Sequence, residues 1–144
     1  MKIKIKKILL FVFAFAVLAA GCSKKQVKPV PKGAVYYRNA SRLISALRKG
    51  YIQKDPDIIR SVSTSNGYNQ VAPGLGRFDS VKLSFTVTWL NVKDSAMDAT
   101  VEWNGVWTKG GQKDKENGTA VFELKGAPLK FNAVLSGSPF IYPK

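Results

Sequence analysis

Few side chains in this sequence are suited to acid–base or nucleophilic chemistry. The 144 residues include no histidine, which excludes mechanisms that need an imidazole base and most zinc sites. The single cysteine, Cys22, excludes an intramolecular disulfide. Tyr36 and Tyr51 could donate a hydrogen bond to an oxyanion, but they need a general base to complete a mechanism.

The carboxylates Asp98, Glu102 and Glu123 fall within segments that alternate polar and apolar residues, a pattern typical of half-buried strands. Side chains alternate between the two faces of a strand, so all three lie on the face opposite Trp103 and Phe122. We therefore expect these carboxylates to point to solvent rather than into a pocket. The residue types predict a protein that is not an enzyme and that holds no metal and no cofactor.

The first 21 residues have the pattern of a targeting segment. Four lysines among residues 2–7 precede a run of thirteen apolar residues, 8–20, which ends in small residues before Cys22. A basic segment, a short apolar run and small residues are typical of a secretory signal. The run is shorter than the roughly 20 residues that a membrane-spanning helix needs. We expect residues 1–21 to be a signal peptide.

The segment Leu18-Ala19-Ala20-Gly21-Cys22 resembles the lipobox of bacterial lipoproteins, with Ala19 where that family prefers leucine. The resemblance implies cleavage between Gly21 and Cys22 and a diacylglyceryl group on the Cys22 sulfur, with acyl chains such as palmitate. Ser23 follows the cysteine, and the family's sorting rule then implies the outer membrane, on its periplasmic face or at the surface, if the host is Gram-negative. The implied location is the cell envelope.

The formal net charge of +14 at first suggests a nucleic-acid partner. However, residues 1–21 carry +4, residues 22–33 carry +4, and residues 34–144 carry +6. Residues 22–33 contain prolines, a glycine and four lysines, which predicts a flexible tether after the cysteine that the lipobox resemblance implies is lipidated. These lysines could contact anionic headgroups or only keep the tether in water. Nucleic acid is not an expected partner, because the signal directs the protein out of the cytoplasm.

Two helices are predicted at the start of residues 34–144. Residues 34–51 repeat apolar side chains at the spacing of one helix face, and a basic stripe opposite that face is expected to be solvated. A second, short helix is predicted to begin with Asp55 as N-cap and Pro56 at its first position. Residues 61–76 are rich in Ser, Asn, Gly and Pro, which predicts a long loop. The apolar face consists of Tyr36, Ala40, Leu43, Ile44, Leu47 and Tyr51, and the stripe of Arg38, Arg42, Ser45 and Lys49.

The rest of the chain predicts antiparallel strands. Residues 81–89, 97–107, 120–124 and 129–135 alternate apolar and polar side chains, and residues 109–118 are expected to form a polar turn. Helices followed by four strands predict an α+β domain in which the sheet curls over the first helix.

This order resembles the NTF2-like, or cystatin-like, α+β cone superfamily over about residues 34–140. The similar segments are residues 52–59 between the helices, the hairpin of 99–103 with 118–124, and the closing 135–140. The resemblance implies an apolar pocket between the helices and the concave sheet, which isomerases and dehydratases of the superfamily use for catalysis.

One face of the predicted sheet and helix is unusually aromatic. These side chains are either an ordinary core, or the lining of a cavity for an apolar ligand or of a groove for a protein partner. We expect a membrane-anchored envelope protein whose domain binds a small apolar ligand or an envelope protein, or acts as a scaffold; the alternative is an isomerase or dehydratase acting on a small apolar substrate. The candidate pocket residues are Tyr36, Tyr51, Phe85, Trp89, Trp103, Trp107, Phe122 and Phe131.

Replacing Cys22 by alanine tests the predicted anchor. Two or three acyl chains, at about 0.8 kcal/mol per buried methylene, would hold the protein on a bilayer almost permanently. Cys22→Ala is therefore expected to move the protein from the membrane fraction to the aqueous fraction of the cell. Cell fractionation followed by immunoblotting measures this distribution. An unchanged distribution of the Cys22→Ala protein between the two fractions would contradict the anchor.

Overall fold

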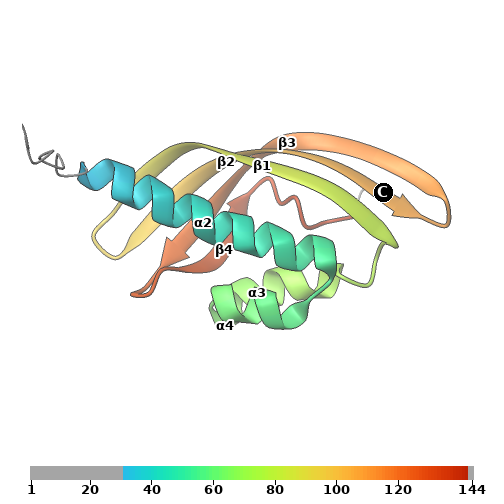
Figure 1. The fold of residues 1–144 in the computed structure, drawn as a ribbon, viewed down its shortest axis with the longest axis horizontal. Helices are drawn as coiled ribbons and strands as arrows, with labels where there is room; N and C mark the ends of the chain where they lie inside the picture. The colour runs from blue at the N-terminus through green and yellow to red at the C-terminus, as the bar shows by residue number, and fades with distance from the viewer. Residues whose placement is uncertain (1–30, 143–144) are drawn as a thin grey trace, which may run out of the picture. The chain divides into compact units, whose positions relative to one another are not determined.

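A computed structural model describes residues 31–142 of the chain. Helices come first along the chain and four antiparallel strands follow, in the spatial order β1-β2-β3-β4 (Figure 1). The predicted signal, Cys22 and most of the tether lie outside the described residues. Within the described part, no helix has the length and apolar character needed to cross a membrane. The elements are α2 (Lys32–Gln53), α3 (Pro56–Val62), α4 (Ser65–Val71), a 3-10 turn η1 (Ala72–Gly74), β1 (Ser80–Val92), β2 (Ala96–Lys109), β3 (Gln112–Lys125) and β4 (Lys130–Ser136).

Helix α3 begins as the sequence predicts. The carboxylate of Asp55 accepts hydrogen bonds from the backbone N–H groups of Asp57 and Ile58, at 2.9 and 3.1 Å, and Pro56 occupies the first turn. These bonds satisfy amides that have no partner inside the helix. The N-cap prediction is confirmed.

The predicted loop over residues 61–76 is wrong, because α4 and η1 occupy most of it. The Thr64 hydroxyl accepts a hydrogen bond from the Gly67 N–H at 3.2 Å and caps α4. Gly67 is buried, and a β-carbon there would lie 2.4 Å from the Phe131 carbonyl oxygen. The glycine therefore serves close packing of α4 on β4, and not a turn.

The predicted turn over residues 109–118 is also wrong, because β3 starts at Gln112. Only Gly110 and Gly111 form the turn, with φ of 56° and 82°. The first half of β3 is mostly exposed on both faces, so polar residues at successive positions hide the alternation that marks a half-buried strand.

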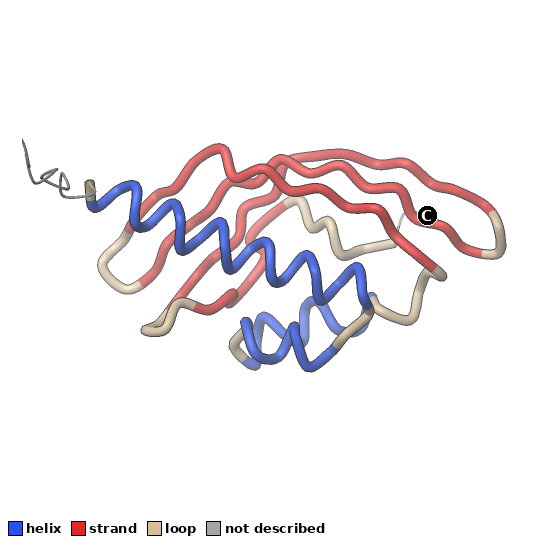
Figure 2. Tube along the Cα trace, viewed as in Figure 1, coloured by secondary structure: helices blue, strands red, loops and turns tan. Residues whose placement is uncertain are grey.

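Helix α2 runs beside the edge strand β1 (Figure 2). The Tyr37 hydroxyl donates to the Val87 carbonyl oxygen at 3.1 Å, and the Arg48 guanidinium donates to the Leu83 carbonyl oxygen at 2.9 Å. These bonds cover carbonyl groups of an edge strand that could otherwise pair with another chain. The start of α2 is thereby fixed next to the second half of β1.

Candidate functional site

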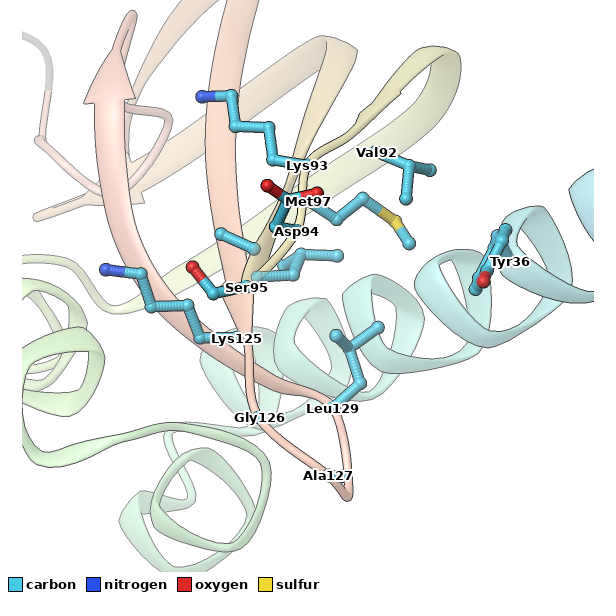
Figure 3. Close-up of a pocket in the computed structure, with 12 residues that line it drawn as sticks. Tyr36, Val92, Lys93, Asp94, Ser95, Met97, Lys125, Gly126, Ala127 and Leu129 are labelled. Carbon is cyan, nitrogen blue, oxygen red and sulfur yellow. The ribbon is translucent and has the colours of Figure 1, made fainter.

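A groove opens between the β1–β2 turn and the β3–β4 turn, and we call it the hairpin groove. It has a volume of about 440 Å³. Figure 3 shows Tyr36, Met97 and Leu129 facing the space, while Lys93 and Lys125 point away from it. The β2–β3 register brings the two turns together, because Met97 pairs with Leu124 and Ala96 pairs with Lys125. Its lining residues are Tyr36, Val92, Lys93, Asp94, Ser95, Ala96, Met97, Leu124, Lys125, Gly126, Ala127 and Leu129.

The space between the helices and the concave face of the sheet is filled by aromatic rings. Phe140 lies at the centre, with its ring centroid 5.0 Å from that of Tyr51, 5.8 Å from Phe122 and 6.3 Å from Phe131. Phe85 adds an edge-on contact with Phe140 at 6.0 Å. Such offset and edge-to-face pairs are favourable beyond the area that they bury.

The chain supplies this central ring from residues 137–142, which we call the C-terminal strap. After β4 the strap turns back at Gly137, which has a φ of 64°. The Trp103 indole N–H donates to the Gly137 carbonyl oxygen at 3.0 Å, and the Tyr142 hydroxyl donates to the Asp114 carboxylate at 2.6 Å. The strap therefore crosses from the end of β4 toward the β2–β3 turn, and it is seen as a tan segment in Figure 2.

No protein-family model matches the chain. A search of curated proteins found no match. Among solved structures, the chain is similar to an NTF2-like superfamily protein from Salmonella enterica subsp. enterica serovar Typhimurium str. LT2. The two are 13% identical with a TM-score of 0.64, and the match covers 74% of this chain and 93% of the other. The domain has an NTF2-like fold. The predicted α+β class, with helices packed on a curved four-stranded antiparallel sheet, is confirmed.

Most of the aromatic residues proposed from the sequence lie in the interior of this NTF2-like cone. Tyr51, Trp103, Trp107, Phe122 and Phe131 are buried, and they pack with one another or with the strap. Phe85 is half-buried beside them. Tyr36 is 42% exposed and lines the hairpin groove, so it does not share the buried position of Tyr51.

Trp89 lies on the opposite face of the sheet, and its predicted place on the aromatic face is wrong. The β1–β2 pairing is regular up to Val87, opposite Val101, and then shifts so that Trp89 is opposite Thr100. This bulge adds one residue to β1 and reverses which side chains face the core. Trp89 is consequently 68% exposed.

The hydroxyl of Tyr51, one of the two candidate hydrogen-bond donors, is buried and has no hydrogen-bond partner within residues 31–142, and the same holds for the indole nitrogen of Trp107. Burial raises the pKa of Tyr51, and the nearby Trp107 N–H lowers it by a smaller amount without reaching the geometry of a full hydrogen bond. The phenol is therefore protonated at neutral pH. Among the described residues, no side chain accepts its proton.

The carboxylates lie on the outer face of the sheet, as strand parity predicts. Asp98 and Glu123 are opposite each other in the β2–β3 pairing, and both are half-buried instead of fully solvated. Lys93 pairs with Asp98, and Lys125 pairs with Glu123 at 2.7 Å. The hydrogen bond from Lys125, with a smaller contribution from Asn132, lowers the pKa of Glu123. Glu102 is exposed. No group of three or more potential metal ligands occurs within residues 31–142.

Replacing Phe140 by alanine tests the filled cone. We expect Phe140→Ala to lower the free energy of unfolding by about 3–5 kcal/mol, because it removes a buried ring and leaves a cavity. The cavity would be lined by aromatic rings, so benzene should raise the melting temperature of the variant but not that of the wild type.

Ile141→Ala is the matched control, since Ile141 is the next residue of the strap and is 60% exposed. It should change the free energy of unfolding by about 0.5 kcal/mol or less. Urea unfolding of the three proteins provides the comparison, and a Phe140→Ala effect as small as that of the control would contradict the central role of Phe140.

Proposed function

We propose that this chain is a bacterial envelope lipoprotein, anchored through Cys22, whose NTF2-like domain is a non-enzymatic binding module. The observation that carries the proposal for the domain is the insertion of Phe140 into the cone. The rings of Phe140, Tyr51, Phe122 and Phe131 occupy the space in which a substrate pocket is expected. These contacts support binding at the surface of the domain instead of in its interior.

The hairpin groove is the proposed binding site. Its volume of about 440 Å³ lies within the roughly 300–1,000 Å³ of small-molecule sites. Tyr36, Met97 and Leu129 present apolar surface to it from three different elements. These features favour a small apolar ligand, or an apolar side chain of an envelope protein that the domain holds as a scaffold.

The N-terminal pattern supports the proposed location. The basic residues, the short apolar run and the lipobox-like segment place the only cysteine where acylation requires it. Ser23 after the cysteine favours the outer membrane in a Gram-negative host.

An isomerase or dehydratase function is the less favoured alternative. In the described part of the chain, Tyr51, the buried phenol, has no partner that could relay its proton. Asp98 and Glu123 lie on the face of the sheet away from the core and are paired with lysines. A general base must come within hydrogen-bond reach of the reacting proton, and these positions favour a binding role over catalysis.

Binding of the apolar fluorophore N-phenyl-1-naphthylamine tests the groove. Residues 31–144 contain the whole described core and can be prepared without the anchor. Leu129→Gln places an amide in the groove and is expected to weaken binding of the fluorophore about tenfold, which corresponds to about 1.4 kcal/mol.

Leu135→Gln is the matched control, because Leu135 is an exposed leucine of β4 that does not line the groove. It should leave the affinity unchanged. Equal affinities of both variants and the wild type, with all three folded by circular dichroism, would contradict the groove as the binding site.

A further inference from the structure

The exposed side of α2 carries positive charge and no negative charge. Residues 31–54 contain six lysines and arginines and no aspartate or glutamate. The basic stripe is exposed, as predicted, whereas Ala40, Ile44, Leu47 and Tyr51 on the opposite side of the helix are buried. In Figure 1, α3 and α4 lie beside the C-terminal half of α2 only. The first half of the stripe is therefore open to a ligand.

A groove follows this first half of the helix, and we call it the arginine groove. It has a volume of about 520 Å³. It is separate from the hairpin groove, because no residue lines both: Tyr37 lines the arginine groove, whereas the adjacent Tyr36 lines the hairpin groove. All of its lining residues come from α2, and they are Ala34, Tyr37, Arg38, Ser41, Arg42 and Ser45.

The two arginines of the groove have no acidic partner in the described part of the chain. Arg38 and Arg42 are one helical turn apart, and neither forms an ion pair within residues 31–142. Arg48 and Arg60 differ from them, because their guanidinium groups donate to the Leu83 carbonyl oxygen and to the Tyr68 hydroxyl. The donors of Arg38 and Arg42 are therefore available to a ligand.

The lining groups favour an anion that has several oxygen atoms. Side chains four residues apart on a helix have β-carbons about 5–6 Å apart, so both guanidinium groups can reach one phosphate. A guanidinium can donate two parallel hydrogen bonds to phosphate oxygens. The exposed Ser45 adds a hydroxyl donor three residues after Arg42. No carboxylate lines the groove, so its lining does not repel an anion.

An apolar wall lies beside these donors. The hydroxyl of Tyr37 donates to the Val87 carbonyl oxygen at 3.1 Å, which holds the tyrosine ring against β1. Ala34 lies one turn before Arg38 and lines the same groove. A phosphate that carries an apolar group would bury that group against this wall, in addition to meeting the positive charge.

We propose that the arginine groove binds a phosphate group with an apolar substituent. Arg38 and Arg42 hold the phosphate, and Tyr37 and Ala34 contact the substituent. Soluble phosphate esters and phospholipid headgroups share this chemistry. The inference goes beyond the proposed function, and it requires neither the hairpin groove nor the anchor at Cys22.

Phosphorus NMR titration of residues 31–144 at fixed ionic strength tests the site. The probes are inorganic phosphate, phenyl phosphate and the short-chain lipid dihexanoyl phosphatidylglycerol. Arg38→Gln combined with Arg42→Gln should weaken binding of both esters at least about tenfold, because two sets of charge-assisted donors are lost. Both side chains are exposed, so circular dichroism should show an unchanged fold.

Two further variants provide controls. Arg60→Gln combined with Arg77→Gln removes the same two charges from exposed arginines that do not line the groove, and it should change the affinities little. Arg38→Lys combined with Arg42→Lys keeps the charge but loses the planar fork. It should weaken binding by less than the glutamine pair.

The outcomes separate a built site from general attraction to a basic surface. An equal loss of affinity in the Arg60 and Arg77 variant, or full affinity in the lysine variant, would overturn the site in favour of general attraction. Ester binding that the glutamine pair leaves unchanged, or no binding of either ester, would also overturn it.

The three probes identify the source of the phosphate. Tighter binding of phenyl phosphate supports a soluble ester as the ligand, and tighter binding of phosphatidylglycerol supports a lipid headgroup. Inorganic phosphate that binds as tightly as both esters would contradict the apolar wall. The titration with N-phenyl-1-naphthylamine depends on Leu129 and not on these arginines, so the hairpin groove and the arginine groove can fail separately.

Discussion

The packing of Phe140 against Tyr51, Phe122 and Phe131 closes the concave face of the sheet, and the surrounding chain is arranged to permit it. Gly137 makes the necessary turn, and a β-carbon there would lie 1.9 Å from the Thr119 carbonyl oxygen. Gly74 of η1 leaves room on the other side, where a β-carbon would lie 2.6 Å from the carbonyl oxygen of Phe140 itself. The strap therefore depends on two glycines that are 63 residues apart. Helices, sheet and C-terminus form one core around this ring.

Because the C-terminal strap fills the cone, the interior and the surface of the domain have different roles. The interior stabilises the fold, and within the described residues the buried hydroxyl of Tyr51 has no hydrogen-bond partner. The surface near the start of α2 carries the hairpin groove, which Tyr36 and Val92 help to line. In the proposed lipoprotein, this is also the end of the domain nearest in sequence to Cys22.

The sequence predicts the parts of the fold that depend on local chemistry. The N-cap at Asp55 and the outer-face position of Glu123 follow from hydrogen bonding and strand parity, and both agree with the structure. The bulge before Trp89 is hard to predict, because Val87, Thr88 and Trp89 still alternate and only the consecutive apolar pair Trp89-Leu90 breaks the pattern one residue later. Gly67 resembles a loop residue until its contact with Phe131 is known. The groove and the role of Phe140 depend on pairings between distant segments, which a single sequence does not reveal.

Crystals of the protein pressurised with xenon would test the filled cone most directly, because xenon enters apolar cavities in protein interiors. A filled cone should hold no xenon among the rings of Tyr51, Phe122, Phe131 and Phe140. A well-occupied xenon site enclosed by these rings would show a hollow cone, and it would contradict the claim that the strap leaves only the surface of the domain for binding.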